Sequence, residues 1–227
     1  MHEIPEEIRT FYESPLGRAA LDLLRAHVEK LWPVLENERI FSLGAAGILF
    51  DGTVSSARMT GTEGENFSCL VDAKNKPLPD ADVDRLAVLH GGASFDLGAL
   101  LREGIRVLKG EGRILLILPR KGGLWDSVPL SPFGQEPAYS ERNVRNLLKR
   151  NGYFIERIDR ALYAPPIDAP WNLFWVPKIE MAAPFVFPFG GGVLVVEAKK
   201  REPGLVGATA QNDRETEAFA AMPMPCG

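Results

Sequence analysis

A continuous apolar run at 113–118, RILLIL, constrains the fold of this chain more than any other feature. An unbroken run of this length is typical of a β-strand that is covered on both faces. Shorter runs predict six further strands, at 39–43, 54–59, 67–71, 84–89, 154–158 and 192–197. Helices are expected between them, at 97–108 from the spacing of apolar residues and at 140–151 before Gly152. This alternation predicts an α/β fold with a mostly parallel, seven-stranded sheet and helices on both faces.

Regions outside this pattern define the expected domain organisation. Apolar residues at helical spacing predict a long helix that Ser14 caps, so residues 1–34 are expected to form an N-terminal helical cap. The α/β domain is expected at 35–201, and it includes a proline- and aromatic-rich insertion at 165–192. Residues 202–227 have little periodicity and are expected to form a disordered tail.

Composition and charge exclude several function classes. Hydrophobic residues make up 45% of the 227 residues, which is enough to form a core. The net charge of −4 gives no electrostatic attraction to nucleic acid, and the chain has no run of about 18 apolar residues that could span a membrane. The two cysteines, Cys69 and Cys226, lie far apart and outside any metal-binding pattern. The sequence therefore predicts a cytoplasmic protein without a structural metal site.

The segment that follows the first predicted strand, 40–47 (IFSLGAAG), is rich in small residues. Ligands of an open parallel sheet bind beyond the carboxyl ends of its strands, where small residues let a ligand approach the backbone closely. Tight internal packing explains the same residues equally well. Asp72, followed by Ala73, ends the third predicted strand, where a carboxylate can accept a hydrogen bond from the amino group of an adenine. The alternative is that Asp72 is a turn residue or a helix cap.

Four further residues are candidates for an acceptor site. His90 follows the fourth predicted strand and could act as a general base near neutral pH, or it could simply line the pocket. Arg120 and Tyr139 follow the strongest strand and could bind a carboxylate or a ring, although Tyr139 could equally pack onto the helix that follows it. Tyr12 could close over the same pocket from the N-terminal helical cap, or pack there without any further role.

Taken in order, three segments resemble those of the class I S-adenosylmethionine-dependent methyltransferases, of the methyltransferase type 11 kind. The segment at 40–47 stands where that family has a glycine-rich loop after its first strand. The segment at 70–90, LVDAKNKPLPDADVDRLAVLH, is similar to the family's stretch from an acidic strand end into the fourth strand. The segment at 100–119, LLREGIRVLKGEGRILLILP, is similar to the family's RVLKPGGRLLL.

The resemblance implies a Rossmann-like, doubly wound fold, with S-adenosylmethionine as the cofactor and a small or apolar molecule as the methyl acceptor. It also implies that His90 lies at the mouth of the pocket, where the family often has histidine or glutamate. The residues that it places against the cofactor come from two segments: Leu43, Gly44, Ala45, Ala46, Asp72 and Ala73.

Three departures from the family pattern concern the cofactor side. Ser42 stands where the family has an acid, and Ala46 and Ile48 stand where it has glycines. No acid ends the second predicted strand, and Glu63 is the nearest candidate to hold the ribose hydroxyls. About ten residues separate the first two strands, which leaves room for one or two helical turns.

These departures keep a second function open beside the methyltransferase. The alternative is a catalytically inactive protein of the same fold that binds a ligand or regulates a partner. A nicotinamide-dependent reductase does not fit, because the small residues after the first strand lack the GxGxxG spacing.

Overall fold

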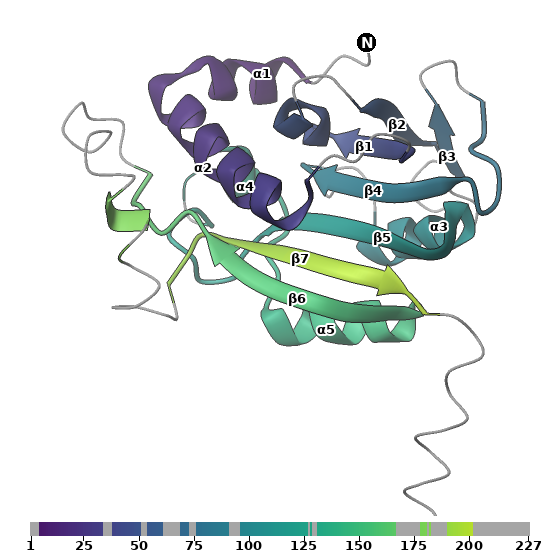
Figure 1. Cartoon of the computed structure of the whole chain (residues 1–227). Coiled ribbons are helices and arrows are strands. Elements are labelled where there is room, and N and C mark those ends of the chain that lie inside the picture. Colours follow the sequence, from purple (N-terminus) through teal and green to yellow (C-terminus); the bar gives the residue numbers. More distant parts are fainter. Residues whose placement is uncertain are drawn as a thin grey trace, which may run out of the picture.

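The computed structural model describes residues 5–33, 38–50, 54–60, 69–72, 76–90, 96–126, 128, 131–166, 178–180, 182 and 190–201. Within these ranges the chain forms a seven-stranded sheet with helices on both faces (Figure 1). The strands are β1 (Ile40–Gly44), β2 (Ser55–Thr60), β3 (Cys69–Asp72), β4 (Val83–Leu89), β5 (Leu108–Pro119), β6 (Tyr153–Ala161) and β7 (Val193–Lys200). The helices are α1 (Glu6–Glu13), α2 (Pro15–Leu31), the 3₁₀ helix η1 (Ala46–Phe50), α3 (Leu97–Val107), α4 (Pro132–Gln135) and α5 (Glu141–Arg150).

The strand order, β3-β2-β1-β4-β5-β7-β6, defines a doubly wound sheet. The chain leaves β1 toward β2 on one side and leaves β4 toward β5 on the other, so the topological switch point lies between β1 and β4. β1, β2, β4 and β5 are parallel to one another, and β6 has the same direction because β7 is antiparallel to both β5 and β6. The predicted Rossmann-like, mostly parallel α/β fold is therefore confirmed.

β3 has the opposite direction to the one predicted, because it pairs antiparallel with β2. Asp72 is level with Ala57, and Cys69 is level with Thr60. The connection between these strands is 61–68, and its eight residues are too few for a parallel crossover, which needs a dozen or more. Consequently β2 and β3 form an antiparallel hairpin, and β3 ends facing the amino ends of the parallel strands. The strand direction therefore differs from the expected one, but the register places Asp72 level with Ala57 of β2 and hence with Leu43 near the carboxyl end of β1.

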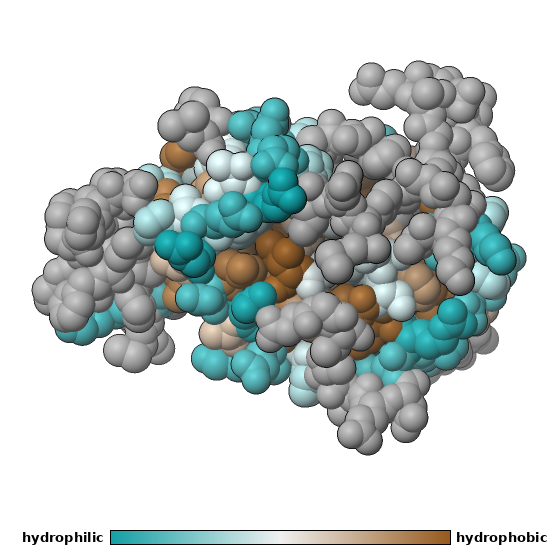
Figure 2. Space-filling view, turned by 90° about the horizontal axis from the view of Figure 1, so that it is seen from above, coloured by the Kyte–Doolittle hydropathy of each residue, from teal (hydrophilic) through white to brown (hydrophobic). Residues whose placement is uncertain are grey.

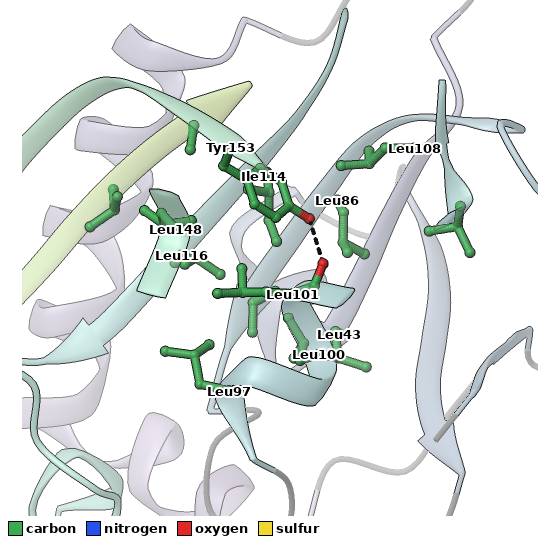
Figure 3. Close-up of a cluster of buried hydrophobic side chains, with 14 of the residues drawn as sticks. Leu43, Leu86, Leu97, Leu100, Leu101, Leu108, Ile114, Leu116, Leu148 and Tyr153 are labelled. Carbon is green, nitrogen blue, oxygen red and sulfur yellow. Dashed lines mark hydrogen bonds between the residues drawn. The ribbon is translucent and has the colours of Figure 1, made fainter. Parts of the chain in front are cut away.

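One face of the sheet is covered by α3 and α5. Their apolar residues pack on alternate residues of the central strands, as the two-residue period of a strand requires. The hydroxyl of Tyr153 donates a hydrogen bond to the carbonyl oxygen of Leu101 at 3.1 Å, so its polar end is satisfied inside the core. Figure 3 shows this cluster around Leu43, Leu86, Leu97, Leu100, Leu101, Leu108, Ile114, Leu116, Leu148 and Tyr153.

The other face is covered by α2, with α1, α4 and η1 beside it (Figure 1). The predicted cap of α2 is confirmed, because Oγ of Ser14 accepts a hydrogen bond from the amide of Gly17 at 3.0 Å. α1 was not predicted from the sequence. It meets α2 at Gly17, where a side-chain carbon would lie 1.9 Å from the carbonyl oxygen of Phe11. The elbow between α1 and α2 therefore admits glycine and no larger residue at this position.

A buried polar network fixes the carboxyl end of α2 to the sheet. Nε1 of Trp32 donates to Oε1 of Glu197 on β7 at 2.9 Å, and Arg113 of β5 donates to the same oxygen at 2.8 Å. The guanidinium of Arg85 on β4 lies over the Trp32 ring, 5.2 Å from its centroid. Trp32 is 1% exposed and Glu197 6% exposed, so this network holds α2 with little competition from water.

Stability is expected to fall on acidification, because His27 of α2 lies against β6 and is partly buried. Burial lowers the pKa of His27 below its ordinary value, and Asp159, 3.4 Å away, opposes this shift in part. The unfolded chain then binds a proton at a higher pH than the folded protein does. The contribution of neutral His27 to the free energy of unfolding is therefore fully present above pH 6.5 and is lost as the pH falls below that value. Urea unfolding at pH 7.5 and pH 5.5 measures this loss.

Two variants test the assignment to His27. His27→Gln is expected to reduce the loss between pH 7.5 and pH 5.5. Asp159→Asn is expected to enlarge it, because the variant removes the carboxylate that favours the protonated ring. An unchanged pH dependence in His27→Gln contradicts the assignment.

Several expectations from the sequence fall outside the described residues. These are the disordered tail at 202–227, most of the insertion at 165–192, and the residues Glu63 and Ala73. Among the helices that the structure describes, none has the length and apolar character needed to cross a membrane.

Candidate functional site

The carboxyl ends of β1 and β4 lie at the switch point, where open sheets of this kind bind ligands. Gly44 ends β1 with a φ of +66° and is exposed. A side-chain carbon at this position would lie 2.2 Å from the carbonyl oxygen of Leu89 and 2.8 Å from backbone atoms of His90. The close approach of the two strand ends therefore requires glycine here. Because Gly44 has no side chain and is exposed, its backbone is accessible at the switch point.

The other residues predicted for the cofactor loop lie beneath the surface. Leu43 is 3% exposed, and Ala45 and Ala46 are fully buried. The amide of Ala45 donates to the carbonyl oxygen of Leu89 at 2.7 Å, which joins the loop to the end of β4. Tight internal packing thus explains both alanines, and among these four residues Gly44 alone is exposed.

η1 forms the short link that the sequence predicted between the first two strands, and one arginine fixes it to α2. Arg25 donates to the carbonyl oxygen of Ile48 from Nε at 2.9 Å and from Nη2 at 2.6 Å. The side chain of Ile48 is half-buried and packs against the core on the α2 face. This packing explains how isoleucine is accommodated where the resembling family has glycine.

Asp72 lies in the β2–β3 hairpin, separated from β1 by β2. Its Oδ1 accepts a hydrogen bond from the amide of Lys76 at 2.9 Å, and its own amide donates to the carbonyl oxygen of Lys76 at 2.9 Å. Two strand spacings, about 10 Å, separate its Cα from β1. Asp72 is level with Leu43 by register, and β2 lies between it and the end of β1. Binding of an adenine by Asp72 stays a prediction.

Three polar side chains from distant parts of the chain meet at the carboxyl end of β4. Oη of Tyr12 on α1 lies 2.7 Å from Nε2 of His90, and Nδ1 of His90 lies 3.1 Å from Oε1 of Glu136. The His90 side chain is fully buried, and that of Glu136 is 5% exposed. We refer to these three residues as the Tyr–His–Glu cluster.

The protons of the Tyr–His–Glu cluster follow from its chemistry. A carboxylate is an acceptor alone, so Nδ1 of His90 carries a hydrogen and donates it to Glu136. When the ring is neutral, Nε2 accepts the hydroxyl proton of Tyr12. Burial raises the pKa of Tyr12 well above its ordinary value, and the charge of Glu136 raises it further, so the phenol keeps its proton. Both nitrogens of His90 therefore have partners in this conformation.

Aromatic rings surround the Tyr–His–Glu cluster. The Phe133 ring lies 4.5 Å from that of His90, and the Phe11 ring contacts Tyr12 edge-on at 5.0 Å. Trp125 contacts Phe133 edge-on at 5.6 Å and donates from Nε1 to a backbone carbonyl at 3.0 Å. In Figure 2, hydrophobic residues are visible in the middle of the upper face, between hydrophilic and undescribed residues. The His90 side chain is therefore packed on the rings of Tyr12 and Phe133.

The backbone of His90 has a conformation that few residues other than glycine adopt. Its φ is +54°, in the left-handed region, where histidine is tolerated better than bulky or β-branched residues. The contact with Gly44 and the two hydrogen bonds of the ring hold this conformation. Backbone strain of this kind accumulates at functional sites, and here it lies at the switch point.

Arg120 and Tyr139 are neighbours at the carboxyl end of β5. They form an isolated parallel bridge, and Nε of Arg120 donates to the carbonyl oxygen of Gly191 at 2.8 Å. Burial lowers the pKa of Arg120, and the charge of Arg160 lowers it further. Tyr139 packs against the α3–α5 face, where burial, followed by the charges of Asp96 and Glu136, raises its pKa. The structure thus pairs Tyr12 with His90, and Arg120 with Tyr139.

Sequence reasoning missed Glu136, which orients His90. Glu136 follows α4, whose first turn is capped by Oγ of Ser131 at 3.1 Å from the amide of Phe133. An acid in the loop after the strongest strand was the available signal. Among the described residues, no three histidine, cysteine, aspartate or glutamate side chains lie close enough together to hold a metal ion.

Comparison with solved structures agrees with this topology. An S-adenosylmethionine-dependent methyltransferase of Thermotoga maritima has a TM-score of 0.54 at 14% identity, over 86% of this chain and 95% of that one. A second such methyltransferase, of Aquifex aeolicus, has a TM-score of 0.53 at 18% identity, over 86% of this chain and 98% of that one. A third, of Mesorhizobium loti, has a TM-score of 0.50 at 15% identity, over 79% of this chain and 100% of that one.

No family model and no curated protein matches the sequence. At these identities the structural similarity concerns the fold. The chain has the fold of the class I S-adenosylmethionine-dependent methyltransferases.

Proposed function

We propose that this protein is an S-adenosylmethionine-dependent methyltransferase that acts on a small or apolar acceptor. The observation that carries the proposal is the position of Gly44: its exposed backbone lies at the switch point, directly against the turn that carries His90. A nucleoside-bearing donor bound along Gly44 would direct its methyl group toward the aromatic surroundings of the Tyr–His–Glu cluster. Positioning of donor and acceptor in such a site supplies much of the rate of a methyl transfer.

The two sides of the site have different proposed tasks. The backbone of Gly44 contacts the cofactor, and Leu43, Ala45 and Ala46 support it from beneath. Tyr12 and His90 lie on the acceptor side, and Arg120 and Tyr139 flank it in the next loop. The proposed partner is a small molecule and not a nucleic acid, in a cytoplasmic setting, as the charge and the cysteine usage favour.

Calorimetry and thermal shift with S-adenosylmethionine, S-adenosylhomocysteine and NADH test the cofactor. Either adenosyl ligand, at 100 times its dissociation constant, is expected to stabilise the protein by about 2.7 kcal/mol. NADH is expected to give no shift. Absence of a shift with both adenosyl ligands contradicts the proposed function.

Asp72→Asn tests whether the carboxylate of Asp72 binds the adenine of the cofactor. The amide oxygen of asparagine can still accept from Lys76, so the hairpin keeps its hydrogen bond. We expect the affinity for S-adenosylhomocysteine to stay within about two-fold, because β2 separates Asp72 from β1 and its Oδ1 already accepts from Lys76. A loss of about ten- to a hundred-fold, the value of a charge-assisted hydrogen bond, would instead support the adenine role of Asp72.

A catalytically inactive protein of this fold is the second candidate, and the engagement of both His90 nitrogens favours it. Such a protein would bind S-adenosylhomocysteine and transfer no methyl group to small acceptors. Radiolabelled methyl transfer, measured on a sample that binds the ligand, distinguishes the two candidates.

A further inference from the structure

In the Tyr–His–Glu cluster the phenol of Tyr12 is the hydrogen-bond partner of His90. His90 is held by Glu136 through Nδ1, so its basic nitrogen, Nε2, faces α1. The hydroxyl of Tyr12 occupies Nε2 at 2.7 Å, the distance of a good hydrogen bond between a hydroxyl and a ring nitrogen. His90 is the only hydrogen-bond partner that the structure describes for the side chain of Tyr12.

The ring of Tyr12 is enclosed as a bound aromatic molecule would be. Phe11 contacts it edge-on at 5.0 Å, and the His90 ring lies 5.7 Å from it at 49°. Phe133 packs against His90, with the centroids of the two rings 4.5 Å apart. The residue is 7% exposed. Edge and tilted contacts of this kind favour a flat aromatic ring and give no hydrogen bond to any group other than its hydroxyl.

We propose that the Tyr12 side chain occupies the acceptor site, and that the acceptor is a small phenol whose hydroxyl replaces that of Tyr12 at Nε2 of His90. The proposal rests on the proposed function and names its substrate class. His90 is then the catalytic base, Glu136 is a positioning residue that keeps Nε2 unprotonated, and the Tyr12 ring leaves when the acceptor binds.

The chemistry of this arrangement balances without a further reactant. The acceptor oxygen forms a new O–CH₃ bond while the S–CH₃ bond of the sulfonium donor breaks, which leaves a neutral thioether. The phenolic proton passes to Nε2 of His90, and the carboxylate of Glu136 stabilises the imidazolium that results. A base is needed here because burial keeps a phenol protonated at this position, as it does Tyr12.

Calorimetry with p-cresol and with toluene, which has the same ring and methyl group but no hydroxyl, tests the proposal. Tyr12→Phe retains the ring and removes the hydroxyl that competes for Nε2. We expect this variant to bind p-cresol at least about five-fold more tightly than the natural protein does, because the hydroxyl that competes for Nε2 is gone, and to bind p-cresol more tightly than toluene, which makes no hydrogen bond to Nε2. Tyr153→Phe is the matched control, because it also removes one buried hydroxyl hydrogen bond, on the other face of the sheet.

Glu136→Gln provides a second test of the same site. The variant is made together with Tyr12→Phe, so that no hydroxyl of the protein competes for Nε2. It removes the carboxylate that fixes the proton on Nδ1, so relative to Tyr12→Phe alone we expect weaker p-cresol binding and unchanged toluene binding. A thermal melt of each variant confirms that it is folded. The proposal is overturned if Tyr12→Phe binds p-cresol no better than Tyr153→Phe does, or if Tyr12→Phe binds p-cresol and toluene with equal affinity.

The same samples separate this inference from the proposed function. Binding of S-adenosylhomocysteine without the p-cresol gain in Tyr12→Phe overturns the phenol site and leaves the proposed function standing. The p-cresol gain without adenosyl binding supports the phenol site and contradicts the methyltransferase.

Discussion

Gly44→Ala is expected to lower the free energy of unfolding by about 3 kcal/mol or more. The positive φ of +66° contributes about 1–2 kcal/mol of this loss for a residue with a side chain. The contact of the new methyl group with the Leu89 carbonyl, at 2.2 Å, adds an overpacking cost of about 1–3 kcal/mol. Urea unfolding followed by tryptophan fluorescence measures the difference.

Gly122→Ala separates these two contributions. Gly122 also has a positive φ, of +72°, but a side-chain carbon there would meet nothing within 4 Å. Its substitution is therefore expected to cost about 1–2 kcal/mol, from backbone strain alone. Equal losses in the two variants would show that the approach of β1 to the His90 turn is looser than the structure has it.

Glu197→Ala is expected to be the second strongly destabilising change, by about 3 kcal/mol. The variant leaves the indole N–H of Trp32 buried without an acceptor, which costs about 1–3 kcal/mol. It also removes the closest carboxylate from Arg113 and creates a cavity under the end of α2. Urea unfolding at neutral pH measures the effect, together with near-ultraviolet circular dichroism of Trp32.

Glu156→Ala is the matched control for Glu197→Ala. Glu156 pairs with the same arginine at 3.1 Å but is 26% exposed, so its loss is expected to cost less than about 1 kcal/mol. If both variants lose the same stability, the buried bond to Trp32 is not what fixes α2.

Local patterns in the sequence predicted much of the fold. Each strand shows its apolar residues within its own span, and the caps at Ser14 and Ser140 are hydrogen bonds between residues three apart. The stop at Gly152, with a φ of +81°, is local in the same way. These features depend on a few neighbouring residues, so they can be recognised without knowledge of the rest of the chain.

The direction of β3 was open to prediction and was missed. The eight residues between β2 and β3 already exclude a parallel crossover, whereas the predicted alternation of strands and helices favours a parallel third strand. As a result Asp72 was expected beside Gly44. A connection length is a physical limit, whereas a similar motif leaves strand direction open.

The Tyr–His–Glu cluster could be predicted only in part. Tyr12 and His90 were each candidates, but 78 residues separate them, and a further 46 separate His90 from Glu136. α1, which brings Tyr12 to His90, is a short helix of eight residues, and such helices depend on tertiary packing more than on their own sequence. The contact therefore appears only once the sheet and the N-terminal helices are placed together.

The bond between Trp32 and Glu197 joins positions 165 residues apart, and β7 inserts between β5 and β6 although it comes last in the chain among the described strands. During synthesis on the ribosome, α2 emerges before every strand of the described sheet and lacks its final anchor until nearly the whole sheet has been translated. Contacts this distant in the sequence slow folding and leave apolar surfaces uncovered in the meantime. The nascent chain is therefore expected to depend on chaperones more than a protein with a locally wound sheet does.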